Sequence, residues 1–259
     1  MAVNNNGVDM CYNVQTVVDD KHSLIVDTNV INNPTDHGQL SEMGKRAKEV
    51  FEVENIIALA DKGYYNADDL KKCEKENITT YVSKQVFSNS TGEREFYSDR
   101  FKYDKEKDVY VCPAGYELKC TRKTPIKEDT KYIEYANYEA CSKCQYKDKC
   151  TTSKQGRRIK RCIDQDFLDL VDERTAKNKE LYKRRQMIVE QPFGTIKRGW
   201  GLSYFLTRGL ESVKTKISLA FLAYKMKRVI NILGIKEIIK RLEELLYSSN
   251  LYTLHINTY

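Results

Sequence analysis

Apolar and polar residues alternate in an early segment of the chain, YNVQTVVDDKHSLIVDTNV, which predicts a β-hairpin. A period of two is typical of a half-buried strand, and the polar run after Val18 supplies a turn before a return strand over 23–30. A helical period then extends to about Val50, with Asp36 as the expected N-cap residue. One face of the first strand would carry four residues, Tyr12, Val14, Thr16 and Val18.

The next apolar run, IIALA, ends on Asp61 and is followed by Lys62 and Gly63. This pattern is typical of a core strand that meets its loop. Ligands of open α/β sheets bind beyond the carboxyl ends of strands, so Asp61 lies where chemistry is common. Aspartate is also frequent in turns for its own sake, and this segment alone favours that interpretation. A helix over 67–76 and a strand around TTYVSK then complete a β-β-α-β-α-β order, which predicts a mixed sheet covered by helices.

The pattern changes between residues 86 and 163, where the chain is polar and rich in Lys, Tyr and Cys. Short strands and turns are expected there, and we interpret this stretch as an insertion in the α/β domain. Helical periodicity returns at about Asp164, and one helix is expected to carry residues 177–201. Pro192 should kink or restart that helix, because proline removes a backbone hydrogen bond.

A long apolar helix is predicted after Gly209, and the segment IKEIIKRLEELLYSS predicts a last amphipathic helix. The fold class is therefore α/β with an internal insertion and a helical C-terminus. The predicted organisation is 1–85 for the first part of the core, 86–163 for the Cys-rich insertion, 164–234 for the second part of the core, and 235–259 for the C-terminal amphipathic helix and tail.

The charge balance is moderately basic, with 44 Lys and Arg against 37 Asp and Glu. This excess permits a nucleic-acid partner without requiring one. The sequence lacks the basic-then-apolar start of a signal peptide and any apolar run of the length a membrane helix needs, so we expect a soluble cytoplasmic protein without a membrane partner. Eight cysteines in such a chain favour metal binding or free thiols over disulfides.

A second acid of interest, Glu190, lies on the predicted helix before Pro192, among several Lys and Arg residues. Tyr182 and Arg185 are three residues apart and share a face, and Lys197 lies two helical turns beyond Glu190. One interpretation is a solvated helix with ordinary ion pairs. The other is a metal-binding carboxylate within a phosphate-binding surface, because Mg²⁺ prefers oxygen ligands and retains substrate phosphates as further ligands.

Four segments, in this order, are similar to known transposase motifs: YNVQTVVDDKHSLIVDTNVINNPTDHGQL, ALADKGYYN, YKRRQMIVEQPFGTIKRGWG and FLTRGLESVKTKISLAFLAYKMKR. Together they make the chain resemble the DDE transposases of bacterial insertion sequences, in particular a subgroup with a Cys-bearing insertion. The resemblance implies an RNase H-like fold, in which a mixed sheet with flanking helices is interrupted by the insertion. It also implies Mg²⁺- or Mn²⁺-dependent cleavage and joining of DNA at transposon ends, self-association on DNA, and association with the bacterial nucleoid.

The same resemblance places the second catalytic Asp on Asp61 and the catalytic Glu on Glu190, both as metal ligands. It gives Tyr182, Arg185 and Lys197 as the companions of Glu190. Lys62 and Arg208 are further DNA-binding candidates, because they neighbour the matched motifs. Arg185 lies five positions before Glu190 where the common pattern has four, so Arg184 or Gln186 remain alternatives.

The family requires three acids, and the first lies on a strand before the one that carries Tyr12. Asp9 lies in a Gly- and Asn-rich context, and Asp19 and Asp27 lie on or beside later strands, so none is assigned that role. We therefore expect an amino-terminally truncated transposase with impaired activity. Two alternatives are a non-catalytic, DNA-binding or inhibitory product of the same element, and a zinc-stabilised protein that uses the fold for another purpose.

Five cysteines fall within residues 112–150, two of them in a CxxC pair. Four thiolates commonly form a structural zinc site, and a small polar insertion would gain folding energy from the metal. Free thiols are the alternative. Related insertions carry one early and three late cysteines, which selects Cys112, Cys141, Cys144 and Cys150 as zinc ligands and leaves Cys120 as a spare or a substitute. The cations that follow could contact phosphate or be solvated: Arg157, Arg158, Lys160 and Arg161.

Overall fold

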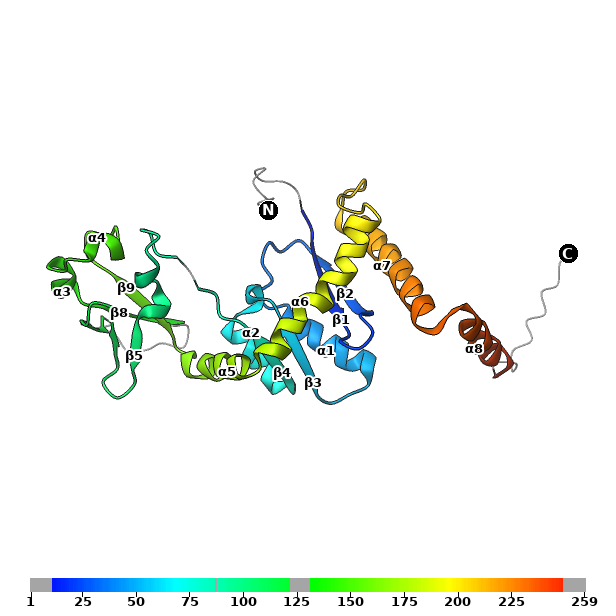
Figure 1. The fold of residues 1–259 in the computed structure, drawn as a ribbon, viewed down its shortest axis with the longest axis horizontal. Coiled ribbons are helices and arrows are strands. Elements are labelled where there is room, and N and C mark those ends of the chain that lie inside the picture. Colours follow the sequence, from blue (N-terminus) through cyan, green and yellow to red (C-terminus); the bar gives the residue numbers. More distant parts are fainter. Residues whose placement is uncertain (1–10, 87, 122–130, 249–259) are drawn as a thin grey trace. The chain divides into compact units, whose positions relative to one another are not determined.

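The computed structural model describes residues 11–86, 88–121 and 131–248 (Figure 1). The chain divides into two compact units. Unit 1 comprises Met1–Ile56, Glu76–Ile78 and Glu180–Tyr259, and unit 2 comprises Ile57–Lys75 and Thr79–Lys179. Each unit is described by itself. None of the described helices combines the length and the hydrophobicity needed to cross a membrane.

Unit 1 begins with the predicted hairpin. Strands β1 (Asn13–Val18) and β2 (Ile25–Ile31) are antiparallel, with Asn13 opposite Ile31 and an irregularity between Val17 and Val18. Helix α1 (Leu40–Phe51) follows close to its predicted range. The expected N-cap was wrong, because Gln39 takes that position. The Asp36 carboxylate instead accepts hydrogen bonds from the side-chain amides of Asn13 (2.8 Å) and Gln15 (2.7 Å) on β1.

The remaining elements of unit 1 are helical: α6 (Lys179–Phe193), the π-helix η4 (Gly194–Gly199), α7 (Leu210–Leu233) and α8 (Ile235–Ser248). The helical C-terminus expected from the sequence is thus present. One face of α7 packs on β2 and η4 and forms the core of the unit. The buried members of this core are Ile25, Val30, Ile196, Val213, Ile217, Phe221 and Tyr224.

The boundary between the units runs through β3 (Ile56–Ala60) and β4 (Ile78–Val82), which form a two-stranded sheet. Helix α2 (Ala67–Lys75) lies between them in the chain. In the described part of the chain, β1–β2 and β3–β4 are separate sheets, so the single mixed sheet predicted from the strand order is not formed by these four strands. The chain is nevertheless a mixture of sheets and helices, as expected for an α/β protein.

A five-stranded antiparallel sheet lies within the stretch predicted as an insertion. Its strands follow in chain order: β5 (Lys102–Asp104), β6 (Val109–Val111), β7 (Glu117–Cys120), β8 (Tyr132–Ala136) and β9 (Arg158–Cys162). The short helices of unit 2 are η1 (Lys62–Tyr64), η2 (Arg94–Phe96), η3 (Ser98–Arg100), α3 (Tyr138–Ser142) and α4 (Lys147–Cys150), and α5 (Gln165–Lys177) leads out of the sheet.

Aromatic residues give this polar stretch its core. The rings of Tyr103, Tyr110 and Tyr135 contact one another, with centroids 5.0–6.1 Å apart. Asp108 accepts hydrogen bonds from the hydroxyls of Tyr103 (2.7 Å) and Tyr135 (2.6 Å), and the guanidinium of Arg161 lies 3.8 Å from the Tyr103 ring centroid. Because their hydroxyls are hydrogen-bonded, these tyrosine rings can pack in the core without leaving a polar group unpaired.

Candidate functional site

Asp61 directly follows β3, as the sequence predicted. Its carboxylate accepts a hydrogen bond from the backbone N–H of Lys62 (2.6 Å), and its backbone carbonyl accepts one from the N–H of Tyr64 (3.0 Å). It therefore caps the short helix η1, which is the turn role that the sequence alone favoured. Asp61 and Lys62 are both exposed to solvent. An exposed carboxylate held at a strand end is also accessible to a metal ion or to a DNA partner.

A half-buried polar pair lies close to this turn within unit 2. Burial raises the pKa of the Tyr65 hydroxyl, and the negative charge of Asp172 on α5 adds to that effect. Burial also raises the pKa of Asp172, against the opposing effects of the Tyr65 hydroxyl and of Lys84. Tyr65 and Asp172 thus associate the segment after Asp61 with helix α5. The sequence reading did not identify this pair, because its two members are more than 100 positions apart in the chain.

Glu190 lies in the last turn of α6 and is exposed. The predicted irregularity at Pro192 takes the form of a π-helix. Proline has no N–H and crowds the carbonyl four residues earlier, which is that of Ile188. The backbone continues in wider turns, in which the N–H of Trp200 donates to the carbonyl of Thr195, five residues earlier, at 3.0 Å. Single π-turns of this kind are frequent at functional sites.

The companions of Glu190 are placed as follows. The guanidinium of Arg185 lies 5.6 Å from the ring centroid of Tyr182, which confirms that these two residues share a face. The Lys197 ammonium, on the π-helix, lies 5.2 Å from the ring centroid of Phe193. Arg208 is exposed between η4 and α7. The widened turns alter the simple two-turn relationship between Glu190 and Lys197 that the sequence predicted.

The alternative to Arg185 raised by the spacing, Arg184, has a structural partner. Both carboxylate oxygens of Asp20 accept hydrogen bonds from Arg184, each at 2.7 Å. The exposed hairpin turn is thereby tied to α6 within unit 1. Arg184 is thus engaged in an ion pair with the hairpin turn.

The three other acids considered for the first catalytic position have different surroundings. Asp19 accepts hydrogen bonds from the backbone N–H groups of His22 (2.7 Å) and Leu24 (2.5 Å), and so closes the hairpin turn. Asp27 forms an ion pair with Arg46 of α1 at 2.7 Å. Asp9 lies outside the described residues. Asp61 belongs to unit 2 and Glu190 to unit 1, and each is described within its own unit.

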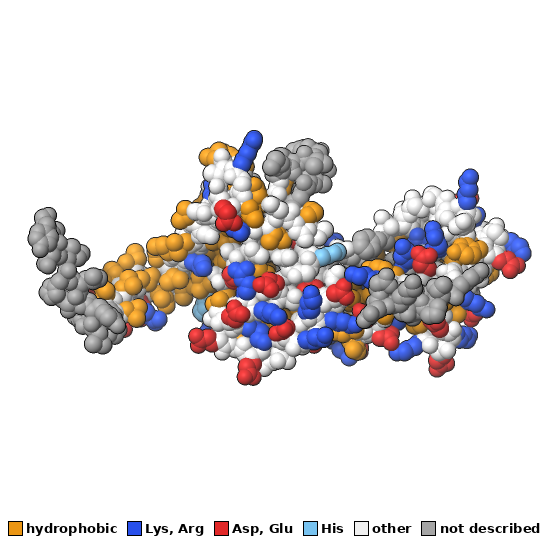
Figure 2. Space-filling view, turned by 180° about the vertical axis from the view of Figure 1, so that it is seen from behind, with side chains coloured by type: hydrophobic (Ala, Val, Ile, Leu, Met, Phe, Trp, Pro, Cys, Tyr) orange, Lys and Arg blue, Asp and Glu red, His pale blue; other side chains and the backbone are white. Residues whose placement is uncertain are grey.

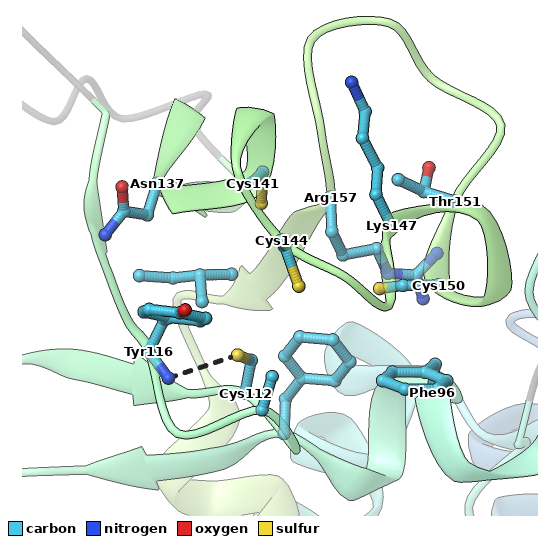
Figure 3. A pocket seen from close by; sticks show the side chains of 13 residues that line it. Phe96, Cys112, Tyr116, Asn137, Cys141, Cys144, Lys147, Cys150, Thr151 and Arg157 are labelled. Atoms are coloured by element: carbon cyan, nitrogen blue, oxygen red, sulfur yellow. Dashed lines mark hydrogen bonds between the residues drawn. The ribbon is translucent and has the colours of Figure 1, made fainter. Parts of the chain in front are cut away.

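Four of the cysteines line one pocket in unit 2 (Figure 3). Cys112 follows β6, Cys141 lies on α3, Cys144 follows α3, and Cys150 ends α4. These are the four that the sequence analysis selected. Cys120 is exposed on β7 and does not contribute to the lining. All eight cysteines of the chain are free thiols in the structure.

The backbone around the pocket is shaped by the thiols. The N–H of Tyr116 donates to the sulfur of Cys112 at 3.3 Å (Figure 3), and the N–H of Gly115 donates to the Cys112 carbonyl at 2.8 Å. Burial raises the pKa of Cys150 to about 11, although the Arg157 guanidinium opposes the shift. A Cβ atom at Gly156 would lie 2.5 Å from the Cβ of Cys141, so only glycine fits there.

The four thiols are not arranged as a metal site in this structure. Across the residues that the structure describes, no three or more His, Cys, Asp or Glu side chains are grouped closely enough to hold a metal ion. The donor chemistry fits zinc, because four thiols from three short segments surround one pocket. Apolar and aromatic residues also line the pocket, among them Phe96, Phe101, Tyr116 and Leu118.

The cations after the cysteine cluster alternate between the two faces of β9, as side chains of a strand do. Arg158 and Lys160 point outward from β9, and both lie near Glu134 of β8, at 3.8 and 3.5 Å. Arg161 is buried and bound to Asp166 at 2.6 Å, and Arg157 lines the cysteine pocket. The idea that all four cations could contact phosphate was therefore wrong for Arg161, which is buried. Arg157 is half-buried, and its possible phosphate contact stays a prediction. The period of two along RRIKRC was the signal that could have separated them.

Residues 111–230 match the family model described as a transposase DDE domain. The matched range contains Glu190 with Tyr182, Arg185, Lys197 and Arg208, and also the four pocket cysteines, whereas Asp61 and Lys62 precede it. No curated protein and no solved structure matched the chain. The match over residues 111–230 supports a DDE transposase.

Proposed function

We propose that this chain is the catalytic domain of a bacterial insertion-sequence transposase, which cleaves and joins DNA at the ends of its element with a divalent metal ion. The observation that carries the proposal is the transposase DDE match over residues 111–230. That range holds Glu190 on a helix whose neighbouring side chains are basic and aromatic. Such a surface suits a phosphodiester substrate, since cations neutralise phosphates and position the backbone.

Asp61 and Glu190 are proposed as the ligands of Mg²⁺ or Mn²⁺. Both are exposed carboxylates, and hard divalent cations prefer oxygen donors while keeping substrate phosphates as further ligands. When bound, the metal would activate a water or a 3′-hydroxyl and stabilise the leaving oxygen. Lys62, Tyr182, Arg185, Lys197 and Arg208 would hold the DNA backbone.

The order of elements supports an RNase H-like core. A hairpin, a helix, the strand ending at Asp61, a second helix and a fourth strand precede the insertion, and the Glu190 helix follows it. Within this proposal the protein acts on DNA in the bacterial cytoplasm, associated with the nucleoid, and its copies associate on DNA.

Zinc is proposed as a structural metal of the insertion, held by Cys112, Cys141, Cys144 and Cys150. The support is that all four line one pocket while Cys120 does not. Small shifts of the short helices α3 and α4 would bring the sulfurs together, and metal binding would then contribute to folding. The N–H of Tyr116 already points to the Cys112 sulfur, as expected for a group that stabilises a thiolate.

A second candidate function is a non-catalytic, DNA-binding or inhibitory product of the same element. One observation favours it: Asp19 and Asp27, two of the acids considered for the first catalytic position, are engaged in a turn and in an ion pair. Two carboxylates would hold a catalytic metal less firmly than three. On this view the chain alone has weak or absent strand-transfer activity.

The test is nicking of a plasmid that carries the ends of the element, in Mg²⁺, by the chain and two variants. Glu190→Gln should abolish nicking, whereas Glu180→Gln, an exposed control on the same helix, should leave it unchanged. Equal nicking by the wild type and Glu190→Gln would refute the catalytic role of Glu190. Efficient joining of ends by the wild type would refute impairment, and DNA binding without any nicking would favour the second function.

A further inference from the structure

Helix α7 is apolar on two opposite faces. The buried face of Val213, Ile217, Phe221 and Tyr224 packs in the core of unit 1. Its register is fixed by two hydrogen bonds to the hairpin turn, from the Tyr224 hydroxyl to the Ser23 carbonyl (3.0 Å) and from Arg228 Nε to the His22 carbonyl (2.7 Å). The core contact therefore accounts for only one of the two faces.

The second face lies roughly opposite, at 3.6 residues per turn. Leu219, Leu222 and Met226 are 63%, 52% and 58% exposed, and Ile230 and Leu233 continue the stripe at 39% and 36%. A surface helix of a soluble protein normally pairs its apolar stripe with a polar opposite face. A helix that is apolar on both sides is typical of one covered on both sides.

Helix α8 extends this surface. It begins directly after Gly234 at the end of α7, and the two helices contact each other. Five of its aliphatic side chains are also at least half exposed: Ile235, Ile239, Leu242, Leu245 and Leu246. Figure 2 shows hydrophobic side chains gathered over this end of the chain. We call these five residues and the five of α7 the α7–α8 face.

We propose that the α7–α8 face is covered by the same face of a second copy of this chain, in a symmetric dimer that forms without DNA. The inference deepens the self-association within the proposed function by naming the surface that mediates it. Two-fold contacts are self-complementary, so one apolar patch on each copy is sufficient.

The area fits a dimer. Burial of a large aliphatic side chain removes about 60–120 Å² of apolar surface, so ten roughly half-exposed side chains offer on the order of 300–600 Å² per copy. A standard interface buries about 800 Å² per partner, and about 65% of a homodimer interface is apolar, which corresponds to roughly 520 Å². The α7–α8 face is therefore comparable in size to the apolar part of a standard interface.

The charges of α8 favour a protein partner over a membrane, whereas α7 is basic, with five Lys and Arg residues against Glu211. Helix α8 carries Lys236, Lys240 and Arg241 against Glu237, Glu243 and Glu244, so its charges balance. Arg241 pairs with Glu237 at 2.8 Å within the helix. Amphipathic helices that bind membrane surfaces are instead rich in Lys and Arg, which attract anionic lipids. A balanced helix also avoids repulsion from its own copy.

The test is the molar mass of the full chain by sedimentation at about 10 µM, without DNA or added divalent metal. The wild type should have twice the chain mass of 30.2 kDa. The double variant Leu222→Glu, Leu242→Glu should weaken association by about 100-fold or more and sediment as a monomer, because its carboxylates would be buried without partners. The control Leu170→Glu, at a 64% exposed position on α5, should remain a dimer.

A monomeric wild type, or a double variant that still dimerises, would overturn the proposal. Co-sedimentation of a monomeric wild type with phosphatidylserine vesicles would overturn it in favour of a membrane surface. Far-UV circular dichroism checks that the variants keep their helices. If the double variant does not fold, the single variant Leu242→Glu, on α8 outside the unit 1 core, decides the question. None of these outcomes depends on nicking, so failure here is distinguishable from failure of the proposed function.

Discussion

The guanidinium of Arg185 lies 5.6 Å from the ring centroid of Tyr182, one helical turn away on α6. The ring restricts where the guanidinium can lie, and a flat cation stacked on an aromatic face loses less side-chain freedom when it binds a phosphate. The same helix carries Glu190 five residues later. In the proposed function, this pair would hold a DNA phosphate on the helix that carries the catalytic carboxylate.

Arg185→Gln should therefore weaken DNA binding. Loss of one phosphate contact should lower the affinity by roughly 5–10-fold near 0.1 M salt and reduce the slope of log affinity against log salt by about 1. The measurement is a salt titration of binding to a labelled duplex by fluorescence anisotropy. Arg100→Gln, which makes the same charge change at an exposed arginine near Asp99, is the control and should leave the slope unchanged. Equal slopes for Arg185→Gln and the wild type would exclude a phosphate contact.

The cysteine pocket predicts a difference between two cysteines of the same insertion. Cys144→Ser should lower zinc affinity by more than about 100-fold, since it removes a ligand and not an outer contact. Cys120→Ser should retain about one zinc ion per chain, because Cys120 lies outside the pocket. Metal content by mass spectrometry after purification without added zinc is the readout. Zinc in neither the wild type nor Cys120→Ser would show that the four thiols are simply free.

Gly156 provides an independent probe of the same pocket. Its backbone has φ of +105°, and a Cβ atom there would lie 2.5 Å from the Cβ of Cys141. Gly92 has φ of +79°, and no described atom lies within 4 Å of a Cβ built on it. Gly92→Ala should thus lower the free energy of unfolding only by the backbone strain, about 1–2 kcal/mol. Gly156→Ala should lower it by at least about 1 kcal/mol more, because the new methyl group also overlaps Cys141.

Urea unfolding curves of the two glycine variants measure this difference. Gly156→Ala should also weaken zinc retention, because Cys141 must move to make room for the new methyl group. Equal destabilisation of both variants would mean that the loop carrying Gly156 adjusts without displacing Cys141.

Local patterns predicted most of the elements but not their long-range partners. The runs that became β3 and α2 have strong periodicity and clear ends, and the structure places them within a residue of the predicted ranges. The N-cap at Asp36 failed because side-chain amides of β1, more than 20 residues earlier, bind that carboxylate. Helix propensity describes a local preference, and tertiary hydrogen bonds overrode it here.

The candidate site shows the same limit. The position of Asp61 after a strand and the shared face of Tyr182 and Arg185 followed from spacing alone. The π-helix after Pro192 did not follow from it. A proline predicts an irregularity but not its type, and Ile196 of the π-helix packs in the core with residues of α7.

The last prediction concerns Asp172, whose pKa is raised chiefly by burial, with a further contribution from Asp169. A carboxyl group with a raised pKa in the folded state binds its proton more tightly there than in the unfolded chain. Asp172 therefore lowers the free energy of unfolding at high pH. This destabilisation is absent below the unfolded pKa of about 3.9, grows as the pH rises through the folded pKa, and is fully present at pH 7. Asp172→Asn removes this cost, so its melting temperature should exceed that of the wild type at pH 7, and the gain should disappear near pH 3.5.

The adjacent Glu173 is the matched control for this prediction. Its pKa is lowered by a hydrogen bond from Lys177, so its contribution has the opposite sign: it is favourable above the unfolded pKa and is lost as the pH falls through the folded value. The group is fully exposed, so solvent screening keeps the effect small. Glu173→Gln should therefore melt at or slightly below the wild-type temperature at pH 7. The measurement is thermal unfolding of the wild type, Asp172→Asn and Glu173→Gln at pH 7 and at pH 3.5. If Asp172→Asn melts below the wild type at pH 7, the ion pair between Asp172 and Lys84 outweighs the cost of burying the carboxylate.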